Sequence, residues 1–178
     1  METQLAYGNW IRKKNLLVLG LGTLGVGAFL LIPLGFLYRL TVAILFAIGL
    51  LSFLFPLYAY VIFSQKGGRF QDKVYNLIIQ SLGPQLTGRI LDIGSGNGVL
   101  AVKLAQQHPA AEVVGIDYWG KDWEYSKRVC EHNAQIAGVD QRVQFQKGDA
   151  AALAFDTDTF DGAIMLTKDN AGDVGAML

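Results

Sequence analysis

Cysteine is nearly absent from this sequence, and its absence narrows what the chain can be. Of 178 residues only Cys130 is a cysteine, which excludes an intramolecular disulfide and a cysteine cluster that binds metal. Net charge is also absent, because 15 basic residues balance 15 acidic ones. A chain without excess positive charge lacks the electrostatic footprint of a general nucleic-acid binder, so we expect no nucleic-acid partner.

Acidic residues are missing altogether between Glu2 and Asp72. Residues 1–70 carry six basic residues and one acidic residue, whereas residues 71–178 carry nine basic and 14 acidic ones. Between Asn15 and Gln65 the single charged residue is Arg39. The chain therefore has an apolar, almost uncharged first part and a more polar second part.

The uncharged first part is long enough for two membrane spans. Arg39 divides it into Leu16–Leu37 and Leu40–Phe63, of 22 and 24 residues. At 1.5 Å per residue a helix of that length covers about 33–36 Å, and the hydrocarbon core of a bilayer is roughly 30 Å thick. We therefore predict a transmembrane helical hairpin over residues 16–63, with its turn at Tyr38-Arg39.

Basic residues flank the outer ends of this hairpin. They are Arg12, Lys13 and Lys14 on one side and Lys66, Arg69 and Lys73 on the other. By the positive-inside rule both ends face the cytoplasm. We predict an integral protein of the plasma or inner membrane with both termini in the cytoplasm, the N-terminal segment being residues 1–15. A signal peptide is the alternative, but its apolar region of about 7–15 residues is shorter and precedes a cleavage site.

The first apolar run contains a glycine pattern typical of dinucleotide-binding folds. Gly20-Leu-Gly22-Thr-Leu-Gly25 fits G-x-G-x-x-G. Such a site needs an acidic residue about 20 positions later to hold a ribose, and none occurs before Asp72. We therefore interpret these glycines, together with Gly27, as small residues that let one membrane helix pack closely against the other. An NAD-linked membrane enzyme is the disfavoured alternative.

Strand and helix patterns alternate after the hairpin. Residues 64–88 are typical of a linker with an amphipathic lead-in helix. The strands predicted beyond them are Arg89–Ile93, Glu112–Ile116, Arg142–Gln146 and Phe160–Met165. With helices between them, this alternation predicts an α/β fold with a parallel, Rossmann-like sheet of about four strands and helices on both faces. We assign residues 89–165 to the cofactor-binding half of such a domain and expect an irregular tail over residues 166–178.

A second glycine-rich turn, Leu91–Gly98 (LDIGSGNG), overlaps the end of the first of these strands. Unlike the dinucleotide pattern it carries an acid, Asp92, before the glycines. A carboxylate there repels a pyrophosphate and suits an ammonium group, and glycines let the backbone approach the ligand closely. Asp117 ends the next strand, where a carboxylate can accept from two ribose hydroxyls. An amino-acid end and a ribose in one ligand indicate S-adenosylmethionine. Trp119 and Trp123 follow this strand and either close over the site or pack against the lead-in helix.

The segment from about residue 71 to residue 165 resembles the class I S-adenosylmethionine-dependent methyltransferases of the small-molecule branch. Leu91–Gly98 matches the family's first motif, and Asp117 matches the acidic end of its second strand. Asn133–Ile164 resembles the run through its third and fourth strands, including the Gly148-Asp149-Ala150 turn. The resemblance implies a Rossmann-like parallel sheet and S-adenosylmethionine as the cofactor.

The resemblance also implies which residues hold this cofactor. Asp92 and the glycine loop hold the methionine end, Asp117 the ribose, and Asp149 with the Ala150 backbone the adenine amino group. Tyr118 either stacks on the adenine or packs structurally, and Asp149 has the alternative of a turn residue. The predicted cofactor-binding residues are Asp92, Gly94, Ser95, Gly96, Gly98, Asp117, Tyr118, Asp149 and Ala150. Methyl transfer from a sulfonium needs alignment more than a base, so we assign no catalytic acid or base, and no metal ligand.

The family's sheet has seven strands, and residues 166–178 are too few to form the fifth strand, its helix and the closing antiparallel pair. We therefore expect a C-terminally incomplete domain with weak methyltransferase activity or none. The predicted function is a membrane-anchored methyltransferase with an unidentified small-molecule acceptor, and membrane tethering favours a lipid, a quinone or another apolar compound. The alternative is a non-catalytic membrane protein with a vestigial cofactor-binding or interaction module.

Overall fold

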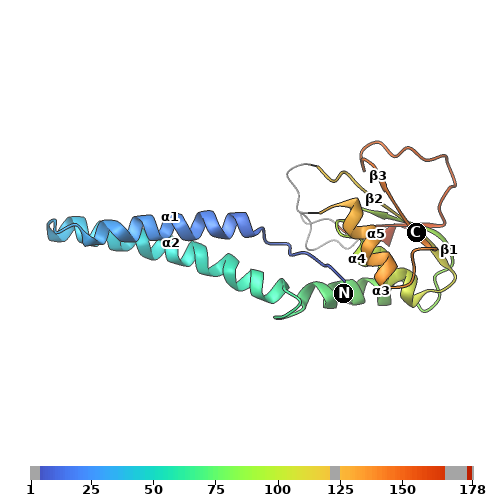
Figure 1. Ribbon diagram of the computed structural model, residues 1–178, viewed down its shortest axis with the longest axis horizontal. Coiled ribbons are helices and arrows are strands. Elements are labelled where there is room, and N and C mark those ends of the chain that lie inside the picture. The colour runs from blue at the N-terminus through green and yellow to red at the C-terminus, as the bar shows by residue number, and fades with distance from the viewer. Residues whose placement is uncertain (1–4, 121–124, 167–175, 178) are drawn as a thin grey trace. The chain divides into compact units, whose positions relative to one another are not determined.

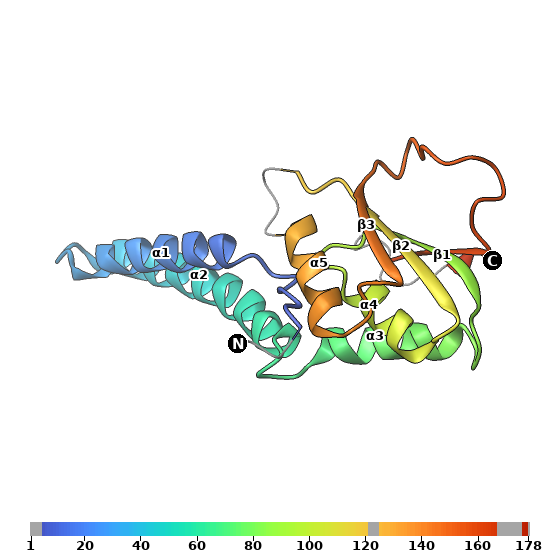
Figure 2. The same ribbon diagram turned by 45° about the vertical axis from the view of Figure 1, so that its right-hand side comes forward.

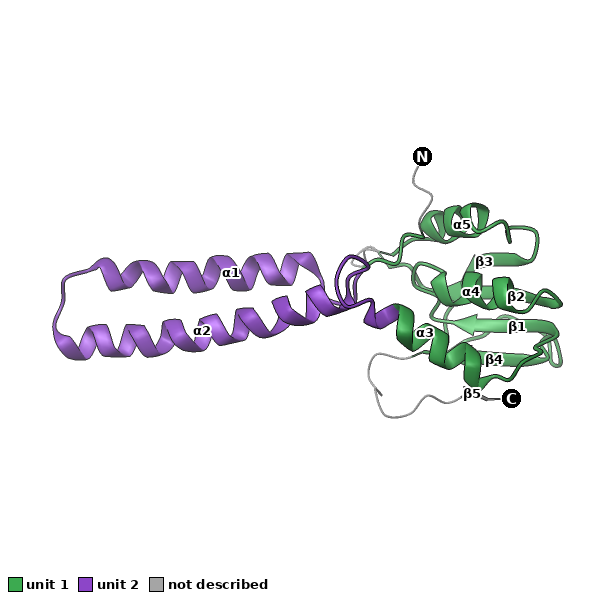
Figure 3. Ribbon diagram, turned by 90° about the horizontal axis from the view of Figure 1, so that it is seen from below, with its two compact units in different colours: residues 1–8, 72–178 green, residues 9–71 purple. Residues whose placement is uncertain are grey.

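The computed structural model describes residues 5–120, 125–166 and 176–177. It divides into two compact units, one of residues 9–71 and one of residues 1–8 and 72–178 (Figure 3). The first unit is a helical hairpin and the second is an α/β domain. The division follows the boundary between the apolar and polar parts of the sequence, except that the N-terminal residues belong to the α/β unit.

The hairpin unit contains α1 (Lys13–Ala28), a 3-10 turn η1 (Phe29–Leu31) and α2 (Phe36–Phe63). α1 and α2 lie side by side (Figure 1). The chain reverses at residues 32–35, so the turn predicted at Tyr38-Arg39 is wrong, and both residues lie in the first turn of α2. Pro33 explains the shift, because proline disfavours a helical conformation at the residue before it. That residue, Ile32, is extended, with ψ 123°.

Two glycines of α1 permit close contact with α2. Gly20 and Gly27 face phenylalanine rings of α2, and a Cβ on Gly27 would lie 2.8 Å from one of them. The predicted packing role is confirmed for these two glycines. It is wrong for Gly22 and Gly25, because nothing lies within 4 Å of the position that their Cβ would occupy. A helix exposes successive glycines on different faces, and only one face of α1 meets α2.

Both arms of the hairpin are long and apolar enough to cross a bilayer. The helical residues 13–31 number 19, and α2 has 28. Many large apolar side chains on them are exposed, among them Leu31, Phe36 and Phe55, whereas a core helix of a soluble protein would bury such side chains. By length and composition the hairpin is a candidate for membrane insertion.

The α/β unit is built on a five-stranded sheet of order β3-β2-β1-β4-β5. Its strands are β1 (Gly88–Ile93), β2 (Ala111–Asp117), β3 (Val143–Lys147), β4 (Gly162–Met165) and the two-residue β5 (Ala176–Met177). The first four strands are parallel, which confirms the predicted α/β fold with a Rossmann-like sheet. β5 pairs antiparallel with β4 and corrects the prediction of an irregular tail over residues 166–178, of which residues 167–175 and 178 lie outside the described residues.

Three helices cover one face of this sheet (Figure 2): α3 (Phe70–Ser81), α4 (Val99–Gln107) and α5 (Lys127–Ile136). They meet the strands in a core of buried side chains that includes Ile79, Leu104, Cys130, Ile90, Val113 and Phe145. For the described residues, the prediction of helices on both faces is therefore wrong.

The direction of the chain explains why the helices share a face. β1, β2 and β3 follow one another in a single direction across the sheet, and right-handed crossovers in one direction place their helices on the same side. The connection from β3 to β4 runs back the other way and so passes over the opposite face. It carries Phe155 and Phe160, which cover Leu91, Ile93, Val114 and Ile116.

Candidate functional site

The strand order reverses beside β1, and this makes the carboxyl ends of the strands there the candidate site. β2 and β4 flank β1 on opposite sides, and open parallel sheets bind ligands at such switch points. β1 ends at Ile93 and is followed by the glycine loop, residues 94–98, which leads into α4. The glycine loop therefore lies where a ligand is expected.

Each of the three glycines in the loop has a left-handed backbone. The φ angles are 79° at Gly94, 56° at Gly96 and 72° at Gly98, values that a residue with a Cβ rarely adopts. A Cβ on Gly98 would also lie 2.6 Å from the ring of Phe145, whereas nothing lies within 4 Å of the corresponding position at Gly94. Gly98 thus permits packing against the core, and Gly94 leaves space in which a ligand can approach the backbone.

Asp117 holds the glycine loop through main-chain amides. Its Oδ2 accepts a hydrogen bond from the Gly96 N–H at 2.8 Å, and its Oδ1 accepts one from the Trp119 N–H at 2.9 Å. Each carboxylate oxygen has a further lone pair, so Asp117 can still accept hydrogen bonds from ribose hydroxyls. The Asp117 carboxylate can therefore bind a ribose while it holds the glycine loop in position.

Trp119 completes the link between β2 and the loop. Its indole Nε1 donates to the Gly96 carbonyl at 2.8 Å, and its φ of 40° is unusual for a residue other than glycine. Trp119 also packs against the core that includes Ile79 of α3. Its closure over the site stays a prediction, and Trp123 lies outside the described residues. A tryptophan two positions after an acidic strand end is the only sequence signal that points to the contact with Gly96.

Asp92 is buried at the end of β1 with one unpaired carboxylate oxygen. The residue is 2% exposed, and none of the described residues donates a hydrogen bond to its Oδ2. Burial, together with the nearby Asp117 carboxylate, raises the pKa of Asp92 to about 7. A buried acceptor without a donor is unfavourable, and a positively charged donor would relieve it. The chemistry at Asp92 therefore fits the ammonium group of S-adenosylmethionine.

Ser95 and Tyr118 lie at the same strand ends but differ in their surroundings. The Ser95 hydroxyl is buried and donates to the main-chain carbonyl of Asp92 at 3.0 Å, so it shapes the loop from within. Tyr118 is 61% exposed, and the Lys147 Nζ lies 4.8 Å from its ring centroid. Structural packing does not account for such an exposed ring, and stacking on an adenine stays a prediction.

The Gly148-Asp149-Ala150 turn lies next to Asp117. The Gly148 N–H donates to the main-chain carbonyl of Asp117 at 3.1 Å. Asp149 Oδ1 accepts from the Ala151 N–H at 2.9 Å, which gives Asp149 the turn role that the sequence left open, while Ala150 is exposed. The structure thus brings all nine predicted residues to the carboxyl ends of β1, β2 and β3, and their contacts with a cofactor stay predictions.

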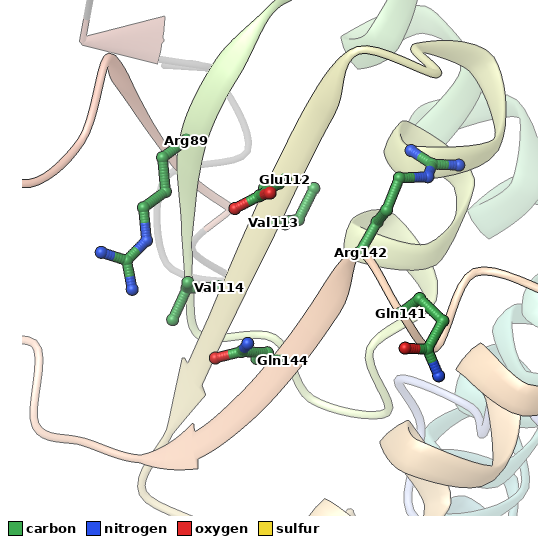
Figure 4. A pocket seen from close by; sticks show the side chains of 7 residues that line it. All are labelled: Arg89, Glu112, Val113, Val114, Gln141, Arg142 and Gln144. Carbon is green, nitrogen blue, oxygen red and sulfur yellow. The ribbon is translucent and has the colours of Figure 1, made fainter.

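A separate hollow lies at the other end of the strands (Figure 4). Its lining residues are Arg89, Glu112, Val113, Val114, Gln141, Arg142 and Gln144. Arg89 and Glu112 are the second residues of β1 and β2, whereas the glycine loop follows the last residue of β1. This hollow is therefore not part of the candidate site.

Within the described ranges, no group of three or more His, Cys, Asp or Glu side chains could hold a metal ion.

Residues 90–171, which include the glycine loop, β2 and β3, match the family model described as "Methyltransferase domain". This match places the segment among methyltransferase domains. It covers the predicted site residues and leaves the hairpin, α3 and the N-terminal residues outside. The match agrees with the enzyme class predicted from the sequence, a methyltransferase.

The names of curated relatives of the methyltransferase segment indicate different methyl acceptors. A demethylmenaquinone methyltransferase of Roseiflexus castenholzii is 38% identical over 94 residues, 52% of this chain and 36% of the relative. One of Thermus thermophilus is 38% identical over 73 residues, 41% and 30% of the two chains. A release factor glutamine methyltransferase of Chlorobaculum tepidum is 35% identical over 66 residues, 37% and 21%. The chain thus spans about a third of the length of these relatives or less.

Among solved structures, the methyltransferase segment is similar to an S-adenosylmethionine-dependent methyltransferase of Thiobacillus denitrificans. That protein was crystallised in complex with S-adenosyl-L-homocysteine. The similarity covers 54% of this chain and 36% of that one, with 26% sequence identity and a TM-score of 0.45.

Proposed function

We propose that this chain is a membrane-anchored methyltransferase that binds S-adenosylmethionine at the glycine loop and methylates a quinone-class acceptor. The observation that carries the proposal is the buried Oδ2 of Asp92 at the carboxyl end of β1, to which no described residue donates a hydrogen bond. The open space at Gly94 gives a ligand access to the backbone beside this carboxylate. A cationic amino-acid end fits both features, whereas the Asp92 carboxylate would repel a pyrophosphate.

In this proposal each acidic side chain binds a different part of S-adenosylmethionine. Asp92 binds the ammonium group, Asp117 accepts from the ribose hydroxyls, and Asp149 accepts from the adenine amino group. Tyr118, whose ring is exposed, stacks on the adenine. The backbone at Gly94 runs along the methionine end, because no Cβ separates the two.

When bound, S-adenosylmethionine supplies a methyl group on a positively charged sulfur. Displacement of that methyl group requires the acceptor to lie in line with the sulfur at about 3–3.5 Å in a site that excludes water. Asp92, Asp117 and the glycine loop hold the cofactor end of that arrangement. Because alignment and desolvation suffice for the displacement, we assign no catalytic acid or base.

Two observations favour a quinone-class acceptor. The relatives from R. castenholzii and T. thermophilus are named demethylmenaquinone methyltransferases, and both arms of the hairpin are long and apolar enough to cross a bilayer. Quinones with apolar tails partition into bilayers, and a tethered domain meets them at a raised effective concentration. The basic residues at the outer ends of the hairpin support an orientation with both ends in the cytoplasm.

The test of this function is methyl transfer by the purified full chain in lipid nanodiscs. Radiolabelled S-adenosylmethionine is added to discs with and without demethylmenaquinone, using the wild-type chain and the Asp92→Asn and Asp140→Asn variants. Asp140 is exposed and serves as the matched control. In keeping with the low activity expected from the sequence, we expect only weak labelling of the extracted quinone with the wild-type chain and Asp140→Asn. Asp92→Asn should lower it further by about tenfold or more, because hydrogen bonds to charged groups are among the stronger ones.

Other outcomes of this assay separate the alternatives. Cofactor binding without transfer to any lipid would support the non-catalytic binding module. Transfer to a lipid other than the quinone would keep the enzyme class and replace the acceptor. Absence of both binding and transfer would contradict the proposed function.

A further inference from the structure

We infer that residues 5–8, which precede the hairpin, form a strap that positions the glycine loop for cofactor binding, with Asn133 as the residue that links strap and loop. The inference rests on the proposed cofactor site and extends it to a segment outside the matched residues 90–171. All the groups involved belong to one compact unit, since residues 1–8 are grouped with the α/β domain.

Asn133 on α5 joins the strap to the loop through its side-chain amide. It is completely buried. Its Oδ1 accepts from the Ala6 N–H at 2.7 Å, and its Nδ2 donates to the Ala6 carbonyl at 3.2 Å and to the Asn97 carbonyl at 2.9 Å. The amide therefore bonds both main-chain groups of one strap residue and one main-chain group of the glycine loop. Asn97 stands between Gly96 and Gly98 within the loop.

Neighbouring strap residues fix the segment on α3 and α4. Leu5 packs against the core of the α/β unit. The Tyr7 hydroxyl donates to Asp72 Oδ1 at 2.7 Å, and the same carboxylate forms an ion pair with Lys103 Nζ at 2.7 Å. The Asp72 and Lys103 side chains are each only 12% exposed, where ion pairs are screened little. The strap is thus anchored on both sides of its contact with Asn133.

Gly8 brings the strap into direct contact with the glycine loop. Its φ is 71°, and a Cβ at this position would lie 2.9 Å from Asn97 Nδ2 and 2.9 Å from the ring of Tyr125. A side chain here would be strained by its backbone and would collide with the loop residue. The chain therefore needs glycine at this point to lie against the loop.

The strap and β2 hold adjacent residues of the loop. Asp117 and Trp119 bond the main chain of Gly96, and Asn133 bonds that of Asn97. Without the strap, Asn133 Oδ1 would lose its donor, and one of the supports of the loop would weaken. A looser loop must be ordered when the cofactor binds, and this ordering lowers affinity.

Variants of the full chain in nanodiscs test the strap from both sides. Ala6→Pro removes the N–H that donates to Asn133 Oδ1. Asn133→Asp keeps the shape of the side chain but loses its two donor bonds. Tyr7→Phe removes the hydroxyl bond alone, and Gln135→Ala, at an exposed position of α5, is the control. The measurements are S-adenosylmethionine affinity by calorimetry, amide hydrogen exchange of residues 94–98 without cofactor, and the thermal unfolding temperature.

We expect Ala6→Pro and Asn133→Asp each to lower the affinity by about tenfold and Tyr7→Phe by about threefold, in keeping with the loss of one or two buried hydrogen bonds. Exchange within residues 94–98 should accelerate in the same order, and Gln135→Ala should change neither quantity. A merely structural role would lower the unfolding temperature while leaving affinity and loop exchange as in the wild-type chain, and that result would overturn the inference.

Failure of the proposed function gives a different result. If the wild-type chain does not bind S-adenosylmethionine, the proposed function is wrong. The exchange rates of residues 94–98 still test whether the strap orders the glycine loop. Unchanged loop exchange in both Ala6→Pro and Asn133→Asp would refute it. Accelerated exchange confined to the loop would support it.

Discussion

Asp92 is the residue at which protonation links the stability of the α/β unit to the proposed binding of S-adenosylmethionine. Its pKa is raised to about 7, chiefly by burial, so the carboxylate becomes charged as the pH rises through neutrality. Because the pKa in the folded state lies above the ordinary value, the folded state binds the proton more tightly than the unfolded state does. The contribution of Asp92 to stability therefore falls between about pH 4 and pH 7. The ionised Asp92 carboxylate lowers the stability of the cofactor-free domain, and it is also the form that would bind an ammonium group.

We predict that the affinity for S-adenosylmethionine rises between about pH 6 and pH 7.5 as Asp92 ionises. Asp92→Asn should remove this rise, lower the affinity at pH 7.5 by about tenfold or more, and raise the unfolding temperature at pH 8 because it removes a buried charge. Calorimetry at several pH values and thermal unfolding measure these effects, with Asp140→Asn as control. An unchanged pH profile in Asp92→Asn would remove Asp92 from the site.

Gly98 is constrained by both backbone conformation and packing, and Gly138 provides a matched comparison. Both have a left-handed backbone, but a Cβ on Gly98 would lie 2.6 Å from the Phe145 ring, whereas nothing lies within 4 Å of that position at Gly138. Gly138→Ala should cost about 1–2 kcal/mol of unfolding free energy from strain alone. Gly98→Ala should cost a further 1–3 kcal/mol, roughly, from overpacking. Denaturant unfolding decides, and equal losses in the two variants would contradict the packing contact.

At the scale of elements, local patterns suffice for the four parallel strands. The bounds of β1 to β4 lie within two residues of those predicted, because alternation of strands and helices and the turn after Ile93 are properties of adjacent residues. The candidate site residues Asp92 and Asp117 and the glycines of the loop follow from similar local motifs, whereas Tyr118, Asp149 and Ala150 follow from the family resemblance. The prediction places the hairpin turn at Arg39, the charged residue between the two apolar runs, and not at Pro33. The prediction fails because proline constrains the backbone, whereas an arginine can stand at the start of a helix.

Contacts between distant segments cannot be predicted in this way. The strap has no sequence signal, because Ala6 and Asn133 are 127 positions apart and no periodicity relates them. The link from Trp119 to Gly96 spans 23 positions and depends on the pairing of β1 with β2. Strand order decides whether helices cover one face of the sheet or both. The sequence pattern does not reveal the strand order.

The contact between α1 and α2 can be tested by a disulfide. A Cβ at Gly49 would lie 3.6 Å from the Cβ of Thr23, within the usual separation of about 3.5–4.5 Å for a disulfide. We predict that Thr23→Cys with Gly49→Cys forms a cross-link under mild oxidation. Adding Gly27→Leu should reduce the yield, because a Cβ there would lie 2.8 Å from the Phe46 ring, and adding Gly25→Leu should not, because its position is open. Equal effects of the two leucines would show that the helices do not pack through this face.

At the scale of the whole molecule, the uneven distribution of charge determines the proposed orientation. Residues 1–70 have an excess of basic residues, and most of these flank the outer ends of the hairpin. We predict that reporter fusions at the N-terminus and directly after Gly67 both report a cytoplasmic location, since basic flanks are retained on that side. An external signal from either fusion would exclude the two-span hairpin.

The proposed site is expected to bind a cationic amino-acid ligand and to reject a dinucleotide. The most direct measurement is a calorimetric titration of the purified full chain, in nanodiscs at about pH 7.5, where Asp92 is mostly charged, first with S-adenosylmethionine and then with NAD. We predict saturable binding of one S-adenosylmethionine per chain and no binding of NAD. Binding of NAD, or no binding of S-adenosylmethionine, would contradict the assignment of Asp92 and the glycine loop to the cofactor.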